Sequence, residues 1–528
     1  MPLLLCRNAL RILPGILYLA SFASTSQASG TAAPVASREN AEETACMKCH
    51  RDQANGFERS KMARSMRRSD REPDGVVHTA EATIRVFSNQ NGTWQTLESH
   101  GHTETYRVEY VIGSGTHAAG YIISLANHLF QSPVAYYRRR AAYGLAPGYE
   151  TETDPDFTRP VKPGCLFCHA GAFAGIPGTI NQYATQPFSH LAISCNRCHG
   201  PVSEHLAHPS PSNIVNPASL DPVSRDSVCE QCHLKGVARV LNPGKQFADF
   251  VAGQPLEQTF TTYRYSMPAG QQPPFRVISH SEQLALSRCK RISGNGMWCG
   301  TCHDPHDEPI NVEPYYRAKC LTCHASTRFA RSHPSKSSNC IDCHMPKKEA
   351  NDGGHTVFTD HRIQKTSDHQ GTGDEPTGIA PWREPPSELA TRNLGMASIE
   401  VGTEAKSWPE IVSGYRLLTD VQHQFADDCE MYQSIGNALF IGKQYSEAQI
   451  AFEIAQRCDP KSTSGEASLA SAYAALGRNE DAEFHLQQAL DLDSMNLSAA
   501  EELIGLYEKD GKTEKADALR SRISSLFH

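Results

Sequence analysis

Seven copies of the pattern Cys-x-x-Cys-His are the residues of this chain whose types and spacing could carry chemistry. In each copy two thiols lie one helical turn apart, and a histidine follows the second thiol directly. This arrangement can close two thioethers on one haem and place the adjacent imidazole on its iron. The cysteines are Cys46, Cys49, Cys165, Cys168, Cys195, Cys198, Cys229, Cys232, Cys299, Cys302, Cys320, Cys323, Cys340 and Cys343. We therefore predict seven covalently bound c-type haems, each with its iron.

Two other uses of a Cys-x-x-Cys pair are possible, a zinc site and a redox dithiol. A zinc site needs two such pairs, or one pair with two histidines, in one local unit, and a redox dithiol needs no following histidine. Here a histidine follows every pair, which favours haem. The histidines predicted as first axial ligands are His50, His169, His199, His233, His303, His324 and His344.

The second axial ligand of each iron decides what the haem can do. Six further histidines stand beside the motifs and are candidates for this role: His190, His205, His280, His306, His333 and His361. A histidine so close to its own motif cannot easily reach the other face of that haem. We therefore expect each to bind a neighbouring haem iron, which would join the haems into a stack.

The first motif differs, because no histidine follows His50 until His78. Met62 is the nearest candidate for its sixth ligand, with Lys61 and Met66 as rivals. A His/Met pair raises the potential of a haem relative to two histidines. If none of these residues binds, this haem is open and could host a small molecule.

Composition limits the remaining possibilities. The chain has 528 residues, a formal charge of -8 and 39% hydrophobic residues, so nucleic acid is not the expected partner and porphyrins would supply apolar volume. Of the cysteines outside the motifs, Cys6 lies near the start. Cys429 and Cys458 could form a disulfide or stay reduced, and Cys289 is expected to be a small core residue.

Residues 1–28 have the layout of a secretory signal peptide. Arg7 and Arg11 precede an apolar run, and Ser26-Gln27-Ala28 offers a small-residue cleavage site. The competing interpretation is an uncleaved anchor, but the run is short and contains Pro14, whereas a membrane span needs about 20 residues. We expect a periplasmic or otherwise exported protein with no transmembrane segment in its mature chain.

The predicted fold is mainly α: a haem-packed cytochrome domain over residues 29–366 with a small inserted β-meander, followed by an α-helical solenoid. The meander, at about 76–137, is indicated by alternating segments at 83–87, 94–97 and 105–112 around an Asn91-Gly92 turn. Between Cys165 and His361 we expect short helices carrying the motifs, joined by long loops. Residues 367–395, rich in Pro and Gly, are predicted to be a linker.

The last part, residues 396–528, repeats with a period of 34 residues. Ala448, Ala482 and Ala516 recur at that spacing, and Gly436 and Phe452 take the small and aromatic positions of a tetratricopeptide (TPR) repeat. Clear repeats are predicted at about 429–462, 463–496 and 497–528, with a degenerate unit before them. A plain helical bundle is the alternative. Such repeats would dock a partner protein.

Several segments resemble a known group of proteins. The motifs CHDPH and CHMPK, the segment HTVFTDHRI and the segments IVNPASL and YVIGSG are similar to those of exported multihaem cytochromes c (cytochrome c-552/c-554-like) with TPR repeats. The resemblance implies electron transfer through stacked haems, and it implies that the six histidines named above are distal ligands. Relatives usually carry a histidine where this chain has Ser60-Lys61-Met62. The lysine-ligated Cys-x-x-Cys-Lys motif of many nitrite reductases is absent.

The sequence therefore favours an exported electron-transfer protein whose repeat domain docks a redox partner protein. The main alternative is an oxidoreductase acting on a small nitrogen or sulfur compound at one open haem, with the first motif as its place. A third is a scaffold whose repeats assemble a larger complex. No catalytic residue is assigned.

Overall fold

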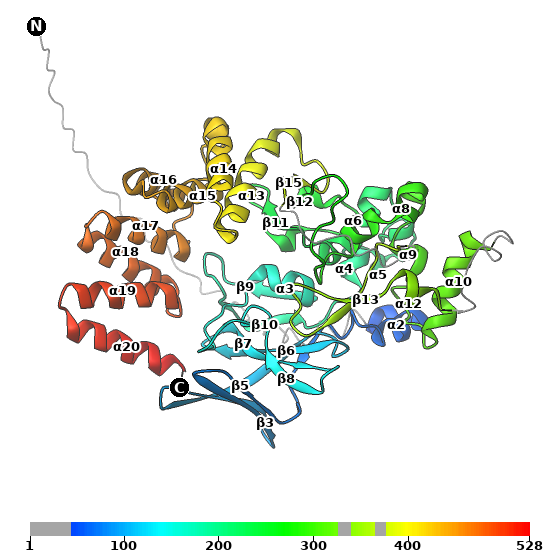
Figure 1. Cartoon of the computed structure of the whole chain (residues 1–528), viewed down its shortest axis with the longest axis horizontal. Helices are drawn as coiled ribbons and strands as arrows, with labels where there is room; N and C mark the ends of the chain where they lie inside the picture. The colour runs from blue at the N-terminus through cyan, green and yellow to red at the C-terminus, as the bar shows by residue number, and fades with distance from the viewer. Residues whose placement is uncertain (1–43, 326–338, 365–375, 528) are drawn as a thin grey trace, which may run out of the picture.

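The computed structural model describes residues 44–325, 339–364 and 376–527. A curved β-sheet lies at one end, the helices that carry the Cys-x-x-Cys-His motifs lie on one side, and an array of helical hairpins runs along the other (Figure 1). The predicted signal peptide and His333 lie outside the described residues. Within the described part of the chain, none of the helices has both the length and the apolar character needed to span a bilayer.

The large sheet has eight antiparallel strands, all from the first third of the chain. Seven follow one another in space in the order of the sequence, and the short first strand pairs with the fifth. The strands are β1 (Met66–Arg68), β2 (Gly75–His78), β3 (Ala82–Asn89), β4 (Gly92–Ser99), β5 (His102–Ile112), β6 (Ala118–Leu125), β7 (His128–Tyr137) and β8 (Ala142–Leu145). The predicted turn at Asn91-Gly92 joins β3 to β4, and the positive φ of Gly92 suits it.

The sheet curls until its first and last strands approach each other. Tyr143 of β8 lies against Gly75 of β2, where any side chain would collide with its ring. The Tyr143 hydroxyl also donates a hydrogen bond to the carbonyl of Pro73 at 2.8 Å. The result is a nearly closed, barrel-like sheet, and an apolar cluster that includes Ile84, Phe130 and Val134 fills it.

The predicted fold class, a mainly α haem-packed domain with a small meander, is wrong. Strands form 20% and helices 44% of the described residues, and the sheet is larger than the predicted insert. Strand β7 explains part of the error, because only Gln131 and Tyr136 in it are partly exposed. A strand that is buried on both faces lacks the alternation of apolar and polar residues that identified β3 and β4.

The motif region also contains more sheet and more conventional core than expected. Strands β9 (Ala172–Gly175) and β10 (Tyr183–His190) pair, as do β13 (Lys347–Glu349) and β14 (Val357–Thr359); β11 (Ala238–Leu241), β12 (Phe260–Ser266) and β15 (Gly378–Pro381) form a third small sheet. Apolar side chains such as Phe167, Leu256 and Phe260 form a buried cluster beside these strands. Side chains, and not cofactors alone, therefore build the core here.

Eight helices form four antiparallel hairpins in the last part of the chain. They are α13 (Ala390–Glu404), α14 (Trp408–Val421), α15 (Cys429–Ile441), α16 (Tyr445–Cys458), α17 (Thr463–Ala475), α18 (Asn479–Leu492), α19 (Leu497–Lys509) and α20 (Thr513–Phe527). Ala448, Ala482 and Ala516 are fully buried at equivalent places in α16, α18 and α20. Gly436 lies against the ring of Phe452, as predicted for a helix crossing that needs a small residue. One continuous apolar core joins the hairpins.

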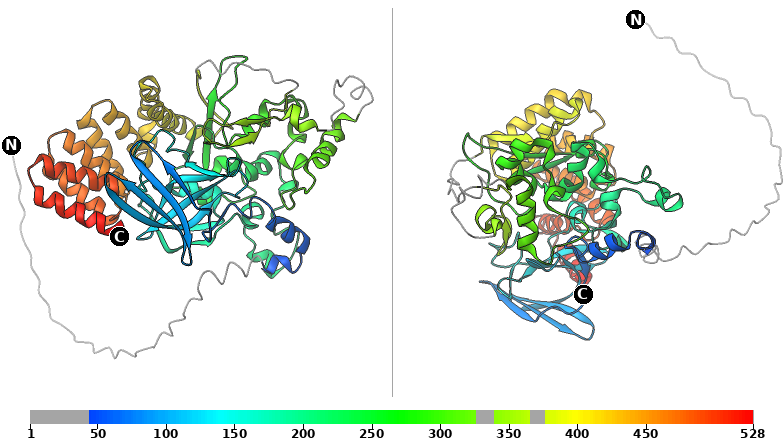
Figure 2. Two further views of the ribbon diagram at one scale, coloured as in Figure 1. Left: turned by 60° about the horizontal axis from the view of Figure 1, so that its bottom comes forward. Right: turned by 90° about the vertical axis from the view of Figure 1, so that its right-hand side faces the viewer.

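The last hairpins are fixed to the large sheet. Met495, in the connection before α19, belongs to the apolar cluster inside the sheet. His128 of β7 and Asp493 are both fully buried, and their Nε2 and Oδ1 atoms lie 2.7 Å apart. In Figure 2 (left) the sheet lies beside the C-terminal end of the hairpin array. The array is therefore part of the same body as the sheet.

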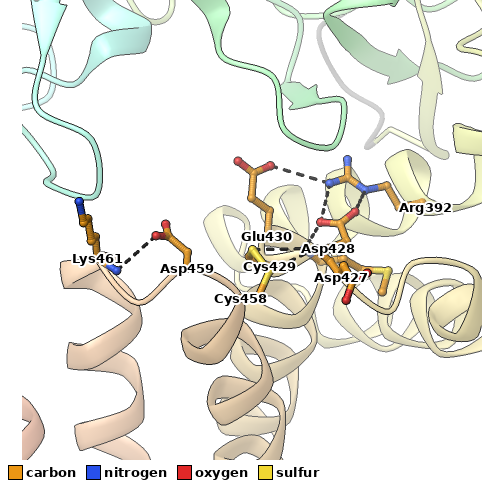
Figure 3. Close-up of a disulfide and its surroundings, with 9 residues drawn as sticks. Arg392, Asp427, Asp428, Cys429, Glu430, Cys458, Asp459 and Lys461 are labelled. Atoms are coloured by element: carbon orange, nitrogen blue, oxygen red, sulfur yellow. Dashed lines mark hydrogen bonds and ion pairs between the residues drawn. A yellow bond between two sulfur atoms is a disulfide. The ribbon is translucent and has the colours of Figure 1, made fainter. Parts of the chain in front are cut away.

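The first hairpins are fixed to the motif region by a buried arginine. Both Nε and Nη2 of Arg392, in α13, bind the carboxylate of Asp428 at 2.7 and 3.0 Å (Figure 3). Nη1 of Arg392 donates to the carbonyl of Leu241 in β11. Cys429 and Cys458 form a disulfide that joins the start of α15 to the end of α16. This decides between the two states that the sequence left open for these cysteines.

The segment predicted as a linker is partly structured. Residues 378–381 form β15, which pairs with β12, and residues 390–395 already belong to α13. Residues 365–375 lie outside the described part of the chain. The connection is therefore bound to the motif region over much of its length.

Candidate haem site

Short helices present the seven motifs, as expected from the sequence. Helices α3 (Pro163–His169), α4 (Asn196–His199), α6 (Pro222–His233), α9 (Cys299–Cys302), α10 (Val312–His324) and α12 (Cys340–His344) carry six of them, and His50 precedes α2 (Arg51–Glu58). In a helix, residues three and four positions apart share one face, so both thiols and the imidazole of a motif point the same way. Asp221 caps α6 and Asn339 caps α12 through their side-chain oxygens.

Four motif histidines face a second histidine from elsewhere in the chain. Two partners, His205 in α5 (Ser203–Ala207) and His280 in α7 (His280–Leu286), come from short helices, and the other two from loops. The ring centroids are 6.3 Å apart for His50 and His205, 5.8 Å for His199 and His306, 6.2 Å for His303 and His361, and 5.1 Å for His233 and His280. Every partner comes from a part of the chain outside the motif that it faces.

These separations can be compared with the space that one metal ion needs. A metal–imidazole bond is about 2.0 Å long and the ring nitrogen lies about 1.1 Å from the ring centroid, so two imidazoles on opposite sides of one iron have centroids about 6.2 Å apart. Three of the four pairs match this value within 0.4 Å. The pair of His233 and His280, at 5.1 Å, would need to open by about 1 Å.

His280 lies in a row of imidazoles. Its centroid is 5.1 Å from that of His233 and 4.9 Å from that of His361, which in turn faces His303. In the described residues, Nδ1 of His280 is buried without a hydrogen-bond partner. A buried polar atom without a partner is costly, and an axial bond to a metal is one way to use this ring. The two motifs that end in His233 and His303 are therefore neighbours in space.

Hydrogen bonds at the other ring nitrogen orient several of these histidines. The Nδ1 atoms of His199, His205 and His361 lie 2.7, 3.1 and 2.9 Å from backbone carbonyl oxygens. A carbonyl can only accept, so Nδ1 carries the hydrogen and Nε2 carries the lone pair. Metal-binding histidines are commonly held in this way. The residues present therefore fit a haem iron with two imidazole ligands.

Burial favours the neutral form of four other histidines, which is the form that binds a metal. Burial lowers the pKa of His169, and burial together with the other imidazoles lowers the pKa of His233 and, more strongly, of His280. For His303 burial lowers the pKa to about 4. The Tyr316 hydroxyl lies 3.0 Å from Nδ1 of His303, a contact that no sequence pattern indicated.

Cysteines of different motifs also meet. Cys168 and Cys232 share a hydrogen bond that lowers the pKa of the first thiol and raises that of the second. A similar contact with Cys299 raises the pKa of Cys229, and Cys320 lies beside Cys340. The motif that begins at Cys229 therefore lies next to the motifs that begin at Cys165 and at Cys299. Groups attached at these thiols would be neighbours as well.

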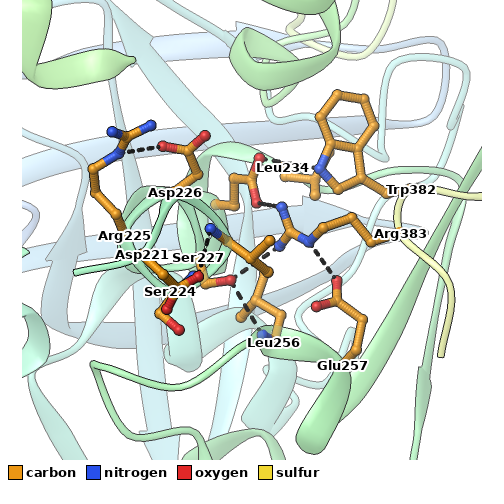
Figure 4. Close-up of polar contacts among 12 residues, drawn as sticks. Asp221, Ser224, Arg225, Asp226, Ser227, Leu234, Leu256, Glu257, Trp382 and Arg383 are labelled. Carbon is orange, nitrogen blue, oxygen red and sulfur yellow. Dashed lines mark hydrogen bonds and ion pairs between the residues drawn. The ribbon is translucent and has the colours of Figure 1, made fainter. Parts of the chain in front are cut away.

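A polar network locks the helix of the fourth motif in place. Arg383, which follows β15, donates to Glu230 and Ser227 of α6 and to Glu257, and the indole nitrogen of Trp382 donates to Glu230 at 3.0 Å (Figure 4). Glu230 is one of the two residues between the cysteines of this motif, and it is buried. The ion pair with Arg383 provides the charge that a buried carboxylate needs.

Comparisons with known proteins give a weak but relevant likeness. The chain is 24% identical over 179 residues to the dissimilatory sulfite reductase MccA of Wolinella succinogenes, which covers 29% of this chain and 22% of the relative. The chain thus matches less than a quarter of the length of that relative. No protein-family model matches the chain.

Solved structures similar to this chain align with about a quarter of it. A MamA structure from Desulfovibrio magneticus RS-1 is 17% identical, with 26% of this chain and 84% of that chain covered and a TM-score of 0.23. The first TPR of Spaghetti (RPAP3), bound to an HSP90 peptide, is 16% identical, with 24% and 99% covered and a TM-score of 0.21.

The structure places the remaining predicted residues as follows. His190 ends β10, with Nδ1 2.7 Å from the carbonyl oxygen of Ala192. His344 makes the same kind of contact to Gln364 at 2.7 Å. Met62, predicted as sixth ligand at the first motif, lies in a partly buried turn after α2, whereas the ring that faces His50 belongs to His205.

Proposed function

We propose that this protein is an exported multihaem c-type cytochrome that transfers electrons through seven covalently bound haems. The observation that carries the proposal is the set of motif histidines that each face a second imidazole at close to the spacing one iron requires. Haem iron, when bound, supplies one-electron transfer. The weak likeness to a multihaem sulfite reductase supports a redox role.

The protein's own residues have three tasks in this function. The fourteen motif cysteines would hold the haems covalently, and the motif histidines would each bind an iron. His205, His280, His306 and His361 would supply second ligands at four of the sites, and we extend this role to His190 and His333. The thiol contacts between motifs support close neighbours along the path, since Cys168 touches Cys232 and Cys229 touches Cys299.

The hairpin array is proposed to dock a redox partner protein. Stacked helical hairpins of this kind present extended surfaces that bind other proteins. The array is also fixed to the motif region through Arg392 and to the sheet through Asp493. A partner held by the array would therefore keep a constant position relative to the haems.

Intact-mass measurement of the exported protein tests the proposal. Protein made in a host with cytochrome c maturation should be heavier than the processed polypeptide by seven haem masses, and its reduced spectrum should show low-spin c-type haem. Replacing both cysteines of one motif, Cys195 and Cys198, with alanine should remove one haem mass. A polypeptide free of haem mass, or one that carries zinc, would refute the function.

A second candidate is an oxidoreductase that acts on a small nitrogen or sulfur compound at one haem with an open sixth position. The likeness to a dissimilatory sulfite reductase favours it. The position of His205 opposite His50 points away from the first motif as the open site. Carbon monoxide binding to one haem of the reduced protein would support this candidate, and a fully low-spin protein that binds none would count against it.

A further inference from the structure

A groove lies where the first hairpins of the array meet the motif region. It has a volume of about 510 Å³, within the range of about 300–1,000 Å³ of sites that bind ligands. Helices α13 and α15 form one wall, and β11 and the short helix η2 (Phe247–Asp249) form the other. The groove therefore joins the proposed docking array to the part of the chain that carries the motifs.

Both apolar and acidic side chains line the groove. Met396, Ile399, Phe247, Phe440 and Ile441 supply the apolar surface. Among these, Ile441 keeps 41% of its surface exposed, which is unusual for an isoleucine. Such a surface gains free energy when a partner side chain covers it.

Three carboxylates, those of Glu400, Glu404 and Glu430, face the groove. Among the described residues that line it, Arg239 is the one cation. Its guanidinium is used elsewhere, because it donates to the carbonyl of Gln231 at 3.1 Å and covers the ring of Phe260. Lys162, at the start of α3, offsets part of the charge of Glu400. The carboxyl groups that line the groove therefore outnumber the cations that line it.

The raised pKa values of two of these carboxyl groups also favour a cationic partner. The groove walls and the neighbouring Glu404 raise the pKa of Glu400 to about 7. The groove walls likewise raise the pKa of Glu430 to about 7, against the effect of Arg392, which lies 3.8 Å away, and with the help of Asp428 and Asp459. A cation placed between these groups would stabilise their ionised forms.

One wall of the groove reaches the second motif. The ring of Phe247 packs on Phe167, one of the two residues between Cys165 and Cys168, with centroids 5.6 Å apart. Phe167 is buried, and Cys168 packs against the apolar cluster to which Phe167 belongs. The groove therefore lies beside the second motif.

From this placement we infer that the groove binds an extended segment of a redox partner protein that carries lysine or arginine side chains alternating with apolar ones. The basic side chains pair with Glu400, Glu404 and Glu430, and the apolar ones cover Ile441 and Phe440. The inference rests on the proposed function, because it names the partner chemistry of the same docking array. It sets the partner beside the second motif.

Calorimetric titration of the full-length holoprotein with three synthetic peptides tests the inference. The first alternates lysine and leucine, the second glutamate and leucine, and the third lysine and serine. We expect the lysine–leucine peptide to bind, more weakly as salt is raised, and the glutamate–leucine peptide not to bind. Equal binding of the glutamate–leucine peptide, or of the lysine–serine peptide, would overturn the inference.

Variants locate the site. The double variant Glu400→Gln with Glu430→Gln should bind the lysine–leucine peptide about tenfold more weakly, and Ile441→Ser about threefold more weakly. Glu447→Gln, on the outer helix α16, is the matched control and should bind like the unchanged protein. Unchanged affinity in the double variant, with unchanged thermal unfolding, would refute the assignment.

The result of the peptide titration can be distinguished from the result of the haem measurements that test the proposed function. Haem mass and spectrum report on the cytochrome function without any peptide, and the titration reports on the groove without any electron transfer. Haem-loaded protein whose groove binds no peptide would refute only the inference. Peptide binding by a protein free of haem would refute only the function.

Discussion

The pair of His50 and His205 gives the sharpest test of the site. Their rings lie 6.3 Å apart with planes 28° from parallel, close to the separation that one iron requires. Replacement of His205 by alanine should remove one axial ligand from one haem. Because the chain has seven motifs, about one seventh of the low-spin haem should become high-spin, and the other six haems should be unchanged.

Three variants measured side by side separate the possible ligands. His205→Ala should add a high-spin signal in low-temperature electron paramagnetic resonance and one carbon monoxide site in the reduced protein. Met62→Ala, which removes the ligand that the sequence suggested, should add neither. His208→Ala changes an exposed histidine three residues away and serves as the matched control.

The expected loss of stability in His205→Ala is small enough to keep the protein folded. The single N–H at Nδ1 of His205 is shared between the carbonyl of Ser210 and Oδ1 of Asn213, so the variant loses one three-centre hydrogen bond, about 1 kcal/mol. The result that would refute the reasoning is a fully low-spin His205→Ala protein together with a high-spin signal in Met62→Ala. Measurement of haem content in each variant excludes simple loss of the haem.

Three further predictions concern the hairpin array. Arg392→Met should lower the free energy of unfolding by about 3–5 kcal/mol, because it leaves the Asp428 carboxylate buried without its partner; a loss below 1 kcal/mol in chemical denaturation would contradict this. Cys458→Ser should lower the free energy of unfolding by about 3–4 kcal/mol, since the disulfide to Cys429 closes a loop with a separation of 29 residues. A reductant should destabilise the unchanged protein by a similar amount and should leave the stability of the variant unchanged. For Glu400 the folded-state pKa of about 7 lies above its ordinary value of 4.5, so the folded state holds the extra proton and stability falls as pH rises from 4.5 to 7. Glu400→Gln should therefore raise the melting temperature at pH 8 and not at pH 4, and an equal change at both pH values would contradict the shift.

Local patterns predicted some elements well. Alternation identified β3 and β4, where one face of the strand is buried, and the spacing of Ala448, Ala482 and Ala516 identified the hairpins, where each of these residues is fully buried. In both cases the signal is a period that neighbouring residues produce together. The seven motifs are equally local, because two thiols and an imidazole within five residues define each.

Long-range features could not be predicted in the same way. The sheet closes because Tyr143 meets Gly75, and no local pattern connects those two residues. The residue that faces His50 could not be predicted locally either. Candidates near the first motif pointed to Met62, whereas His205 comes from beyond the third motif. The acidic groove also combines residues of two helices and a strand that lie far apart in the sequence.

Attachment of the array matters more for function than its repeats alone. A flexible linker would have let the array carry a bound partner over a wide range of positions, which suits a tether. The structure instead fixes the array at Arg392, where Asp428 and Leu241 hold the guanidinium, and at Asp493, which binds His128. A partner docked in the groove would then face the same motif in every encounter. Because the rate of electron transfer depends on distance, rigid attachment would keep the distance between a docked partner and the proposed haem path constant.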